Sequence, residues 1–496
     1  MAWRRYGPVA GVALLLAVLP ACVTNPATGR HQLILFSSRQ EVALGRQADP
    51  EIRAEYGVYP DPALGGFVAE VGARIASASD RPDLPYSFTI LDSPVVNAFA
   101  LPGGPVYVTR GLLAHARDEA ELAGVLAHEV GHVVGRHGAE QMSRARLAGL
   151  GLEALTLARP GLSRAAGLLG AGARLLLLKF GRDAEREADA LGVRYLAAAG
   201  YDPFGLPRFL GVLDRLEQER GRLLPAWLST HPDPGERAAV TRRAAARLAP
   251  PEGSSAGQPV RREEGYLRRL SGLVWGEDPR QGFVRGSTFH HPALRFRIDF
   301  PPGWSVQNSA RLVAAADDPR APRGQIVLTQ VAPDAEGASS PEARVAALAR
   351  RNPELRFERE GDRVNGLPAW AGRIVAPGRD GGPPVTALAL WVLHGGRLYR
   401  ILGRWDPAAP ARERAIAASL ASFRPETDPD VLGIEPAVLS VEPAREGQTI
   451  AALCAARRDL AEDCETIARL NRRAPGATLA GGELLVLPVR GRASAR

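Results

Sequence analysis

The chain has 496 residues, of which 45% are hydrophobic and 23% charged, a composition typical of globular rather than disordered proteins. This length predicts roughly two to four domains. The formal net charge is +8, but the 62 basic residues are dispersed and accompanied by 54 acidic ones, which argues against a protein that binds nucleic acid.

Residues 1–22 have the pattern of a bacterial signal peptide. Two arginines precede an apolar run over residues 9–19, which is too short to span a bilayer comfortably. The residues LPAC at 19–22 then resemble a lipobox, in which Cys22 becomes lipidated after cleavage. Ordinary secretion, with Cys22 removed or left free, is the alternative. Val23 follows the cysteine, and by resemblance to lipoprotein sorting this favours an anchor in the outer membrane, on the periplasmic side.

The next stretch predicts a mixed α+β domain. Apolar periodicity over residues 37–78 predicts helix, and alternation over residues 86–91 predicts a strand. Two β-prone runs, 97–101 and 106–109, flank Pro-Gly-Gly-Pro, which predicts a hairpin or a sharp turn.

Residues 123–137 read AGVLAHEVGHVVGRH, which predicts a buried helix with a metal-binding face. Because helical positions i and i+4 lie on one face, His128 and His132 can bind one metal ion, with Glu129 beside them. Upstream, Asp118 can cap this helix, and Glu121 can reach back to complete a capping box.

The remaining histidines have no such spacing with a carboxylate. His137 is five residues past His132 and is predicted to lie off the ligand face. We interpret it as an ordinary histidine, like His31, His115, His290, His291 and His394.

Residues 182–189, RDAEREAD, offer the third ligand that a catalytic zinc requires. Glu185 and Asp189 share one helical face, so Glu185 can bind the metal while Asp189 accepts a hydrogen bond from a ligand histidine. Glu187 points elsewhere and is predicted to be solvated. Taken alone, this segment could also be a charged surface helix.

Four motifs of this chain resemble those of peptidase family forty-eight and follow one another in the order expected for that family. These are the gluzincin zinc metallopeptidases that include the CAAX prenyl protease, HtpX and BepA. Two are the His-Glu-x-x-His motif at 128–132 and the Glu-x-x-Ala-Asp motif at 185–189. The others are NAFALPGG at 97–104 and STHP at 229–232, followed by Arg237. The resemblance implies a mainly helical zincin-type domain over residues 30–249, with a small edge-strand sheet and one Zn²⁺.

The family pattern also implies roles for residues around the active-site cleft, in which the substrate would bind. The strand at Asn97 and Ala98 would pair with the substrate backbone, unless Asn97 only completes a turn. His231 would approach the metal, either stabilising the tetrahedral intermediate or closing the fourth position in a resting state, and both roles stay open. Arg237 would orient the neighbouring loop or bind an acidic group. Residues 142–180 would form a soluble lid or plug, or else a surface for membrane or partner contact.

The composition changes after the peptidase-like region. Residues 250–265 have the composition of a linker, and residues 266–425 predict an α+β accessory domain with a faint resemblance to PsbP-like proteins. Residues 436–490 resemble a degenerate LysM repeat, which implies peptidoglycan binding, although a small fold without a ligand is the alternative. Cys454 and Cys464 could form a disulfide or stay as two buried thiols.

These patterns predict an α+β zinc endopeptidase of the bacterial cell envelope, which hydrolyses misfolded or misassembled envelope proteins with Glu129 as general base. Its expected partners are polypeptide substrates, the membrane through a lipid anchor, and peptidoglycan or the envelope assembly machinery. One alternative is an envelope chaperone or assembly factor with a latent protease site. Another is a peptidoglycan-binding adaptor.

Overall fold

The computed structural model describes residues 22–158, 180–220, 231–250, 258–319, 321–331, 340–378 and 382–491. The predicted signal peptide, most of the predicted lid and the middle of the predicted linker lie outside these residues, as does the side chain of Cys22. Over the part that is described, no helix combines the length and the apolar character needed to cross a membrane.

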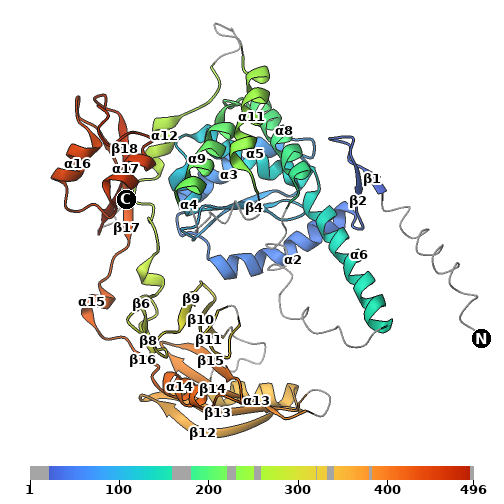
Figure 1. Ribbon diagram of the computed structural model, residues 1–496, viewed down its shortest axis with the longest axis vertical. Helices are drawn as coiled ribbons and strands as arrows, with labels where there is room; N and C mark the ends of the chain where they lie inside the picture. The colour runs from blue at the N-terminus through green and yellow to red at the C-terminus, as the bar shows by residue number, and fades with distance from the viewer. Residues whose placement is uncertain are drawn as a thin grey trace, which may run out of the picture. The chain divides into compact units, whose positions relative to one another are not determined.

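The chain forms two compact units and has the α+β class that its sequence predicts (Figure 1). The first unit consists mainly of Met1–Gly276 together with Val438–Val489, and the second of Glu277–Ala437. The C-terminal segment therefore belongs to the first unit. Leu439, Leu484 and Val486 lie in the same hydrophobic core as the helices of the peptidase-like region.

Helices dominate the first unit. Those described before residue 277 are α2 (Ser38–Tyr56), α3 (Pro62–Ser77), α4 (Arg110–His115), α5 (Glu119–Val134), α6 (His137–Ala158), α8 (Arg182–Ala198), α9 (Gly205–Arg220), α11 (Pro234–Leu248) and α12 (Glu263–Arg269). A short pair, β1 (Cys22–Thr24) and β2 (His31–Leu33), precedes them.

The small sheet of this unit has the strand order β3-β5-β4, formed by β3 (Ser87–Leu91), β5 (Pro105–Thr109) and β4 (Ala98–Ala100). β4 and β5 are antiparallel, with Ala98 opposite Val108, so the predicted hairpin is confirmed. β4 pairs only with β5 within the described sheet, and it lies against α5. The sheet thus presents an edge strand beside the helix that carries the histidine motif.

Every residue of α5 is buried, which makes it the central helix of the unit. Asp118 caps it by accepting a hydrogen bond from the Glu121 N–H at 2.8 Å. The Glu121 carboxylate reaches one residue further back than a capping box requires and accepts the Arg117 N–H at 2.9 Å.

Glycines let the backbones of α5 and α8 approach closely. A Cβ atom added at Gly131 of α5 would lie 2.7 Å from the carbonyl oxygen of Ala188 in α8. A Cβ atom added at Gly192 of α8 would lie 3.1 Å from the Cα of His128. This close crossing brings the carboxylate of Glu185 to the histidines of α5.

Replacing Gly131 with alanine should separate the two helices. We expect Gly131→Ala to lower the free energy of unfolding by about 1–3 kcal/mol, because the methyl group meets backbone that cannot move aside locally. The same shift should weaken zinc binding. Urea unfolding and competition with a chromogenic zinc chelator measure the two effects.

Gly65→Ala is the matched control, since a Cβ at this position in α3 would meet no atom within 4 Å. It should leave zinc binding unchanged and cost no stability, because alanine is the better helix former. Equal zinc affinity in Gly131→Ala and the parent chain would contradict the idea that this crossing positions Glu185.

The second unit is built on two antiparallel sheets, one of seven strands in the order β12-β13-β14-β15-β11-β10-β9 and one of four in the order β16-β8-β7-β6. Phe296 and Ile298 of β8 point into its core, as the sequence alternation predicts. The strands are β6 (Phe283–Arg285), β7 (Thr288–His291), β8 (Phe296–Asp299), β9 (Ser305–Asn308), β10 (Leu312–Ala316), β11 (Gly324–Gln330), β12 (Arg356–Val364), β13 (Leu367–Ala376), β14 (Val385–His394), β15 (Arg397–Trp405) and β16 (Arg424–Pro425). The helices are η2 (Pro279–Gln281), α13 (Pro341–Arg351), α14 (Pro410–Ala421) and α15 (Pro429–Leu432).

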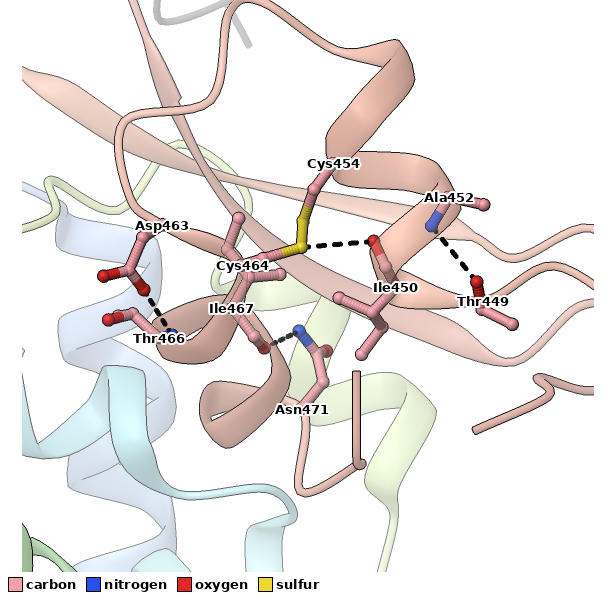
Figure 2. The surroundings of a disulfide bond; sticks show 9 residues. All are labelled: Thr449, Ile450, Ala452, Cys454, Asp463, Cys464, Thr466, Ile467 and Asn471. Atoms are coloured by element: carbon pink, nitrogen blue, oxygen red, sulfur yellow. Dashed lines mark hydrogen bonds between the residues drawn. A yellow bond between two sulfur atoms is a disulfide. The ribbon is translucent and has the colours of Figure 1, made fainter. Parts of the chain in front are cut away.

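The C-terminal segment pairs β17 (Ala437–Pro443) with β18 (Leu484–Arg490) around α16 (Ile450–Ala456) and α17 (Cys464–Leu470). A disulfide joins Cys454 to Cys464, with Cα atoms 5.9 Å apart, and so links the two short helices (Figure 2). Thr449 and Asp463 cap these helices through hydrogen bonds to the N–H groups of Ala452 and Thr466.

Candidate metal centre

Four buried side chains meet at one point between α5, α8 and the start of α11. His128 and His132 come from α5, Glu185 comes from α8, and His231 stands three residues before α11. One possible ligand atom from each residue lies within 4.8 Å of those from the other three. The structure therefore brings together the three predicted ligands and the predicted fourth histidine.

The spacing of these atoms fits a tetrahedral zinc ion. Ligand atoms at about 2.0–2.1 Å from zinc lie about 3.3 Å from one another. The Nε2 atoms of His128 and His132 are 3.0 Å apart, and they lie 3.6 and 3.4 Å from the nearest oxygens of Glu185. The Nδ1 atom of His231 is 3.4 Å from His128 Nε2 and 2.8 Å from Glu185 Oε1. Three imidazoles and a carboxylate are ligands that zinc prefers.

The carboxylate of Glu129 is the second sign of an active site. Glu129 is only 1% exposed, and neither of its oxygens accepts a hydrogen bond from a described residue. His231 Nε2 lies 3.8 Å from its Oε1. Because burying a carboxylate without donors is costly, this group is suited to bind a water molecule or a substrate group beside the metal.

Asp189 contacts His128, as its spacing in the sequence predicts. Its Oδ1 lies 3.0 Å from Nδ1 of His128, so that imidazole donates from Nδ1 and presents Nε2 to the metal position. Arg237 binds both oxygens of Asp189, at 2.7 and 2.8 Å. Burial alone would raise the pKa of Asp189, but the Arg237 charge holds it below its ordinary value.

Arg237 also binds the ligand carboxylate. Its Nη1 lies 2.7 Å from Oε2 of Glu185, so the acidic groups that it contacts belong to the chain itself. Burial would raise the pKa of Glu185, but the charges of His231 and Arg237 hold it well below its usual value. Arg237 thus keeps both carboxylates ionised in a buried site.

Two residues that the sequence reasoning set aside also support the centre. His137 was interpreted as ordinary, but its Nδ1 lies 2.8 Å from Nδ1 of His132. Glu187 was predicted to be solvated, but its Oε2 lies 3.0 Å from Nε2 of His137 and 2.9 Å from Nη1 of Arg30. Both interpretations were wrong. Glu187, His137 and His132 form a hydrogen-bonded relay that ends at the metal position.

The relay fixes the tautomer of its histidines. Burial would raise the pKa of Glu187, but hydrogen bonds led by the one from His137 lower it to about 2, so the carboxylate is charged. His137 therefore donates its Nε2 proton to Glu187 and accepts the Nδ1 proton of His132. Burial holds the pKa of His132 well below its usual value, so the ring is neutral and its Nε2 lone pair faces the metal position.

Helical spacing failed for His137 because the helix ends before it. α5 stops at Val134, and Arg136 has a left-handed φ of 55°. The chain then turns and starts α6 at His137, so this side chain comes back toward His132. The sequence offered one signal of this helix end, because Arg136 follows a glycine at the end of the apolar stripe. Only the observed turn shows where His137 points.

Phe180 is a further residue that the motifs did not indicate. Its ring stacks on the imidazole of His132, with centroids 4.2 Å apart and planes at 26°. It also lies 5.7 Å from the ring of His231. The aromatic ring therefore covers one side of the ligand cluster and shields it from water.

Asn97 and Ala98 lie where β4 begins, at the edge of the sheet. Thr109 donates its backbone N–H to the Asn97 carbonyl at 3.0 Å, which holds the start of the strand. The Asn97 Oδ1 atom is buried, and no described residue donates a hydrogen bond to it. Ala98 is fully buried, and its backbone pairs with Val108 of β5.

Loss of the relay should weaken zinc binding. His137→Leu removes the group that accepts the His132 Nδ1 proton, and we expect the zinc Kd to rise by about 10- to 100-fold. Glu187→Gln keeps an acceptor for His137 and should cause a smaller loss. Chelator competition measures both.

His394→Leu, in the second unit, is the control and should bind zinc like the parent chain. A His137→Leu chain that is folded by circular dichroism and retains full zinc affinity would show that the relay does not support the ligand.

A buried ligand set of this kind, with an unbonded carboxylate following the first histidine, defines a zinc metallopeptidase domain. Residues 63–245 match the family model described as peptidase family M48, and this part of the chain is a domain of that family. The family's metalloendopeptidases use zinc, which agrees with the ligand set found here.

Curated proteins that are similar to this chain are also named as proteases. The chain is 34% identical over 256 residues to the beta-barrel assembly-enhancing protease of Yersinia pestis, covering 49% of this chain and 52% of that protein. It is 35% identical over 218 residues to the mitochondrial metalloendopeptidase OMA1 of Schizosaccharomyces pombe, covering 43% of this chain and 63% of that protein. The match to the first of these spans about half the length of that relative.

One solved structure is similar to a part of this chain. It is the solution structure of cyanobacterial PsbP from Synechocystis, with 11% sequence identity and a TM-score of 0.23, covering 29% of this chain and 94% of that one. A similarity at this level supports no conclusion about the fold.

Proposed function

We propose that this chain is a zinc-dependent endopeptidase, in which His128, His132 and Glu185 hold the metal and Glu129 is the general base. The observation that carries the proposal is the buried ligand cluster with the unbonded Glu129 carboxylate beside it. When bound, zinc would act as a Lewis acid that acidifies water and polarises the scissile carbonyl.

The side chains of this chain would do the remaining work. Glu129 takes a proton from the attacking water and later donates it to the leaving amine. The edge strand at Asn97 and Ala98 pairs with an extended substrate backbone, and the Asn97 Oδ1 accepts a hydrogen bond from it. Asp189 and Arg237 keep His128 and Glu185 in position throughout.

The Glu129→Gln variant tests the base. Glutamine keeps the shape of the side chain but cannot accept the proton, so casein cleavage should fall by at least about 100-fold. The variant should still contain one zinc ion per chain, measured by plasma emission spectroscopy.

Glu70→Gln, an exposed position on α3, is the matched control and should cleave like the parent chain. Cleavage by Glu129→Gln at the parent rate would remove Glu129 from the mechanism.

A second candidate function is that of an envelope chaperone or assembly factor with a latent protease site. His231 favours it, because its Nδ1 lies among the predicted ligand atoms and would compete with water for a zinc ion held by His128, His132 and Glu185. Glu185 raises the pKa of His231 against the effect of burial, which shows how closely the two side chains interact. In this arrangement the resting site is closed.

The His231→Ala variant separates the two roles of this histidine. If His231 closes the fourth position, its removal should raise casein cleavage by several-fold while His128, His132 and Glu185 still hold zinc. A loss of cleavage with zinc retained would instead assign it to stabilising the tetrahedral intermediate. Asn352→Ala, in the second unit, controls for a general effect of truncation.

We further propose that the chain acts in the bacterial envelope, anchored to the outer membrane through Cys22, on misfolded or misassembled envelope proteins. The signal-peptide pattern, the disulfide and the similarity to beta-barrel assembly-enhancing proteases support this. The second unit would dock substrates or partners. The LysM-like segment would bind peptidoglycan.

A further inference from the structure

A cavity of about 620 Å³ lies in the first unit, away from the four metal-ligand residues, none of which lines it. Its walls come from α9, α11, the residues around α17, and Trp275. A volume of this size is typical of sites for small ligands. Five of the residues that line it, Thr466, Arg469, Leu470, Arg472 and Arg473, belong to the LysM-like segment, and none belongs to the four peptidase motifs.

The cavity is strongly basic. Six arginines line it, and no acidic side chain among the described residues does. These arginines are Arg208, Arg215, Arg242, Arg469, Arg472 and Arg473. They come from three separate stretches of sequence, which explains why the sequence gives no sign of a basic cluster.

Part of this charge is balanced behind the cavity wall. Arg472 forms a bidentate ion pair with Glu121, and Arg208 contacts Asp118 at 3.1 Å. Arg473 pairs with Glu483 at 2.8 Å, and Arg469 lies 3.8 Å from Glu465. Arg215 and Arg242 are exposed and form no ion pair with a described residue. The excess positive charge of the cavity therefore comes from Arg215 and Arg242.

The cavity also has apolar and aromatic lining residues. Trp275 stacks with His115, with ring centroids 5.6 Å apart, and Leu216 and Leu470 line the cavity as well. Aromatic faces of this kind bind rings and sugars by stacking, while arginines bind oxyanions in a bidentate manner. The two features together select a ligand that has both a charged and a flat part.

We propose that this cavity, the arginine pocket, binds a compact ligand that carries two or more phosphate groups on a sugar or another flat ring. A phosphate group carries a charge of about −1.5 to −2 and three acceptor oxygens, so two of them match several guanidinium groups within a small volume. An acidic polypeptide has lower charge density and would need an extended groove. The proposal does not depend on the peptidase activity.

Calorimetry on the full zinc-loaded chain tests the pocket, with sodium tripolyphosphate as the probe at constant ionic strength. We expect saturable binding to one site. The double variant Arg215→Gln/Arg242→Gln should weaken it by about tenfold or more, since it removes two charge-assisted contacts. It leaves the ion pairs of Arg208 and Arg472 intact, so the fold should be retained.

Arg243→Gln is the matched control, because this arginine is next to Arg242 on α11 but does not line the cavity. Equal binding by this control and the double variant would overturn the proposal. So would the absence of binding beyond that of sodium chloride. Tighter, pocket-dependent binding of an oligoglutamate peptide would overturn it in favour of an acidic polypeptide.

Vesicle sedimentation distinguishes the sources of such a ligand. Phosphatidylcholine vesicles would carry diphosphoryl lipid A, with monophosphoryl lipid A as the matched probe. Recruitment that needs both phosphates and both arginines would assign the pocket to a phosphorylated lipid headgroup. Tripolyphosphate binding without such recruitment would assign it to a soluble phosphorylated ligand.

Discussion

The burial of α5 is the constraint on which the rest of the structure depends. Because all of its residues are buried, the helix takes two histidines and three glutamates out of water, and α8 adds the carboxylates of Glu185 and Asp189. Uncompensated charges in such a place would cost several kcal/mol each. The structure meets this cost with Arg237, which binds both carboxylates of α8, and it gathers four side chains that could hold a cation.

The precision of the site comes from backbone contacts more than from the ligands themselves. Glycine allows α8 to approach α5 on one side, and Gly205 allows α9 to approach it on another, since a Cβ at Gly205 would lie 2.1 Å from the Ala120 carbonyl oxygen. Helices that meet backbone to backbone cannot shift by small side-chain adjustments. The relative positions of His128 and Glu185 are therefore set before any metal binds.

Sequence reasoning succeeded where the contact lies within one element. His128 and His132 share a face of α5, Glu185 and Asp189 share a face of α8, and Pro-Gly-Gly-Pro marks the hairpin of β4 and β5. It failed where a contact depends on how elements are placed. The relay through His137 needs the left-handed turn at Arg136, and the apolar residues of the C-terminal segment do not reveal which core they join.

The contacts of the C-terminal segment show why it belongs with the peptidase domain. Arg472 binds Glu121 in the first turn of α5, and Arg117 donates to Asn471 and to the Leu484 carbonyl. These bonds hold the N-terminal end of the helix whose other end carries the metal ligands. The arginine pocket lies among the same contacts, and α11 carries both Arg242 of the pocket and Arg237 of the metal centre. The pocket and the metal centre are thus built on shared helices, so deleting the C-terminal segment would remove support for α5 as well as any ligand that the segment binds.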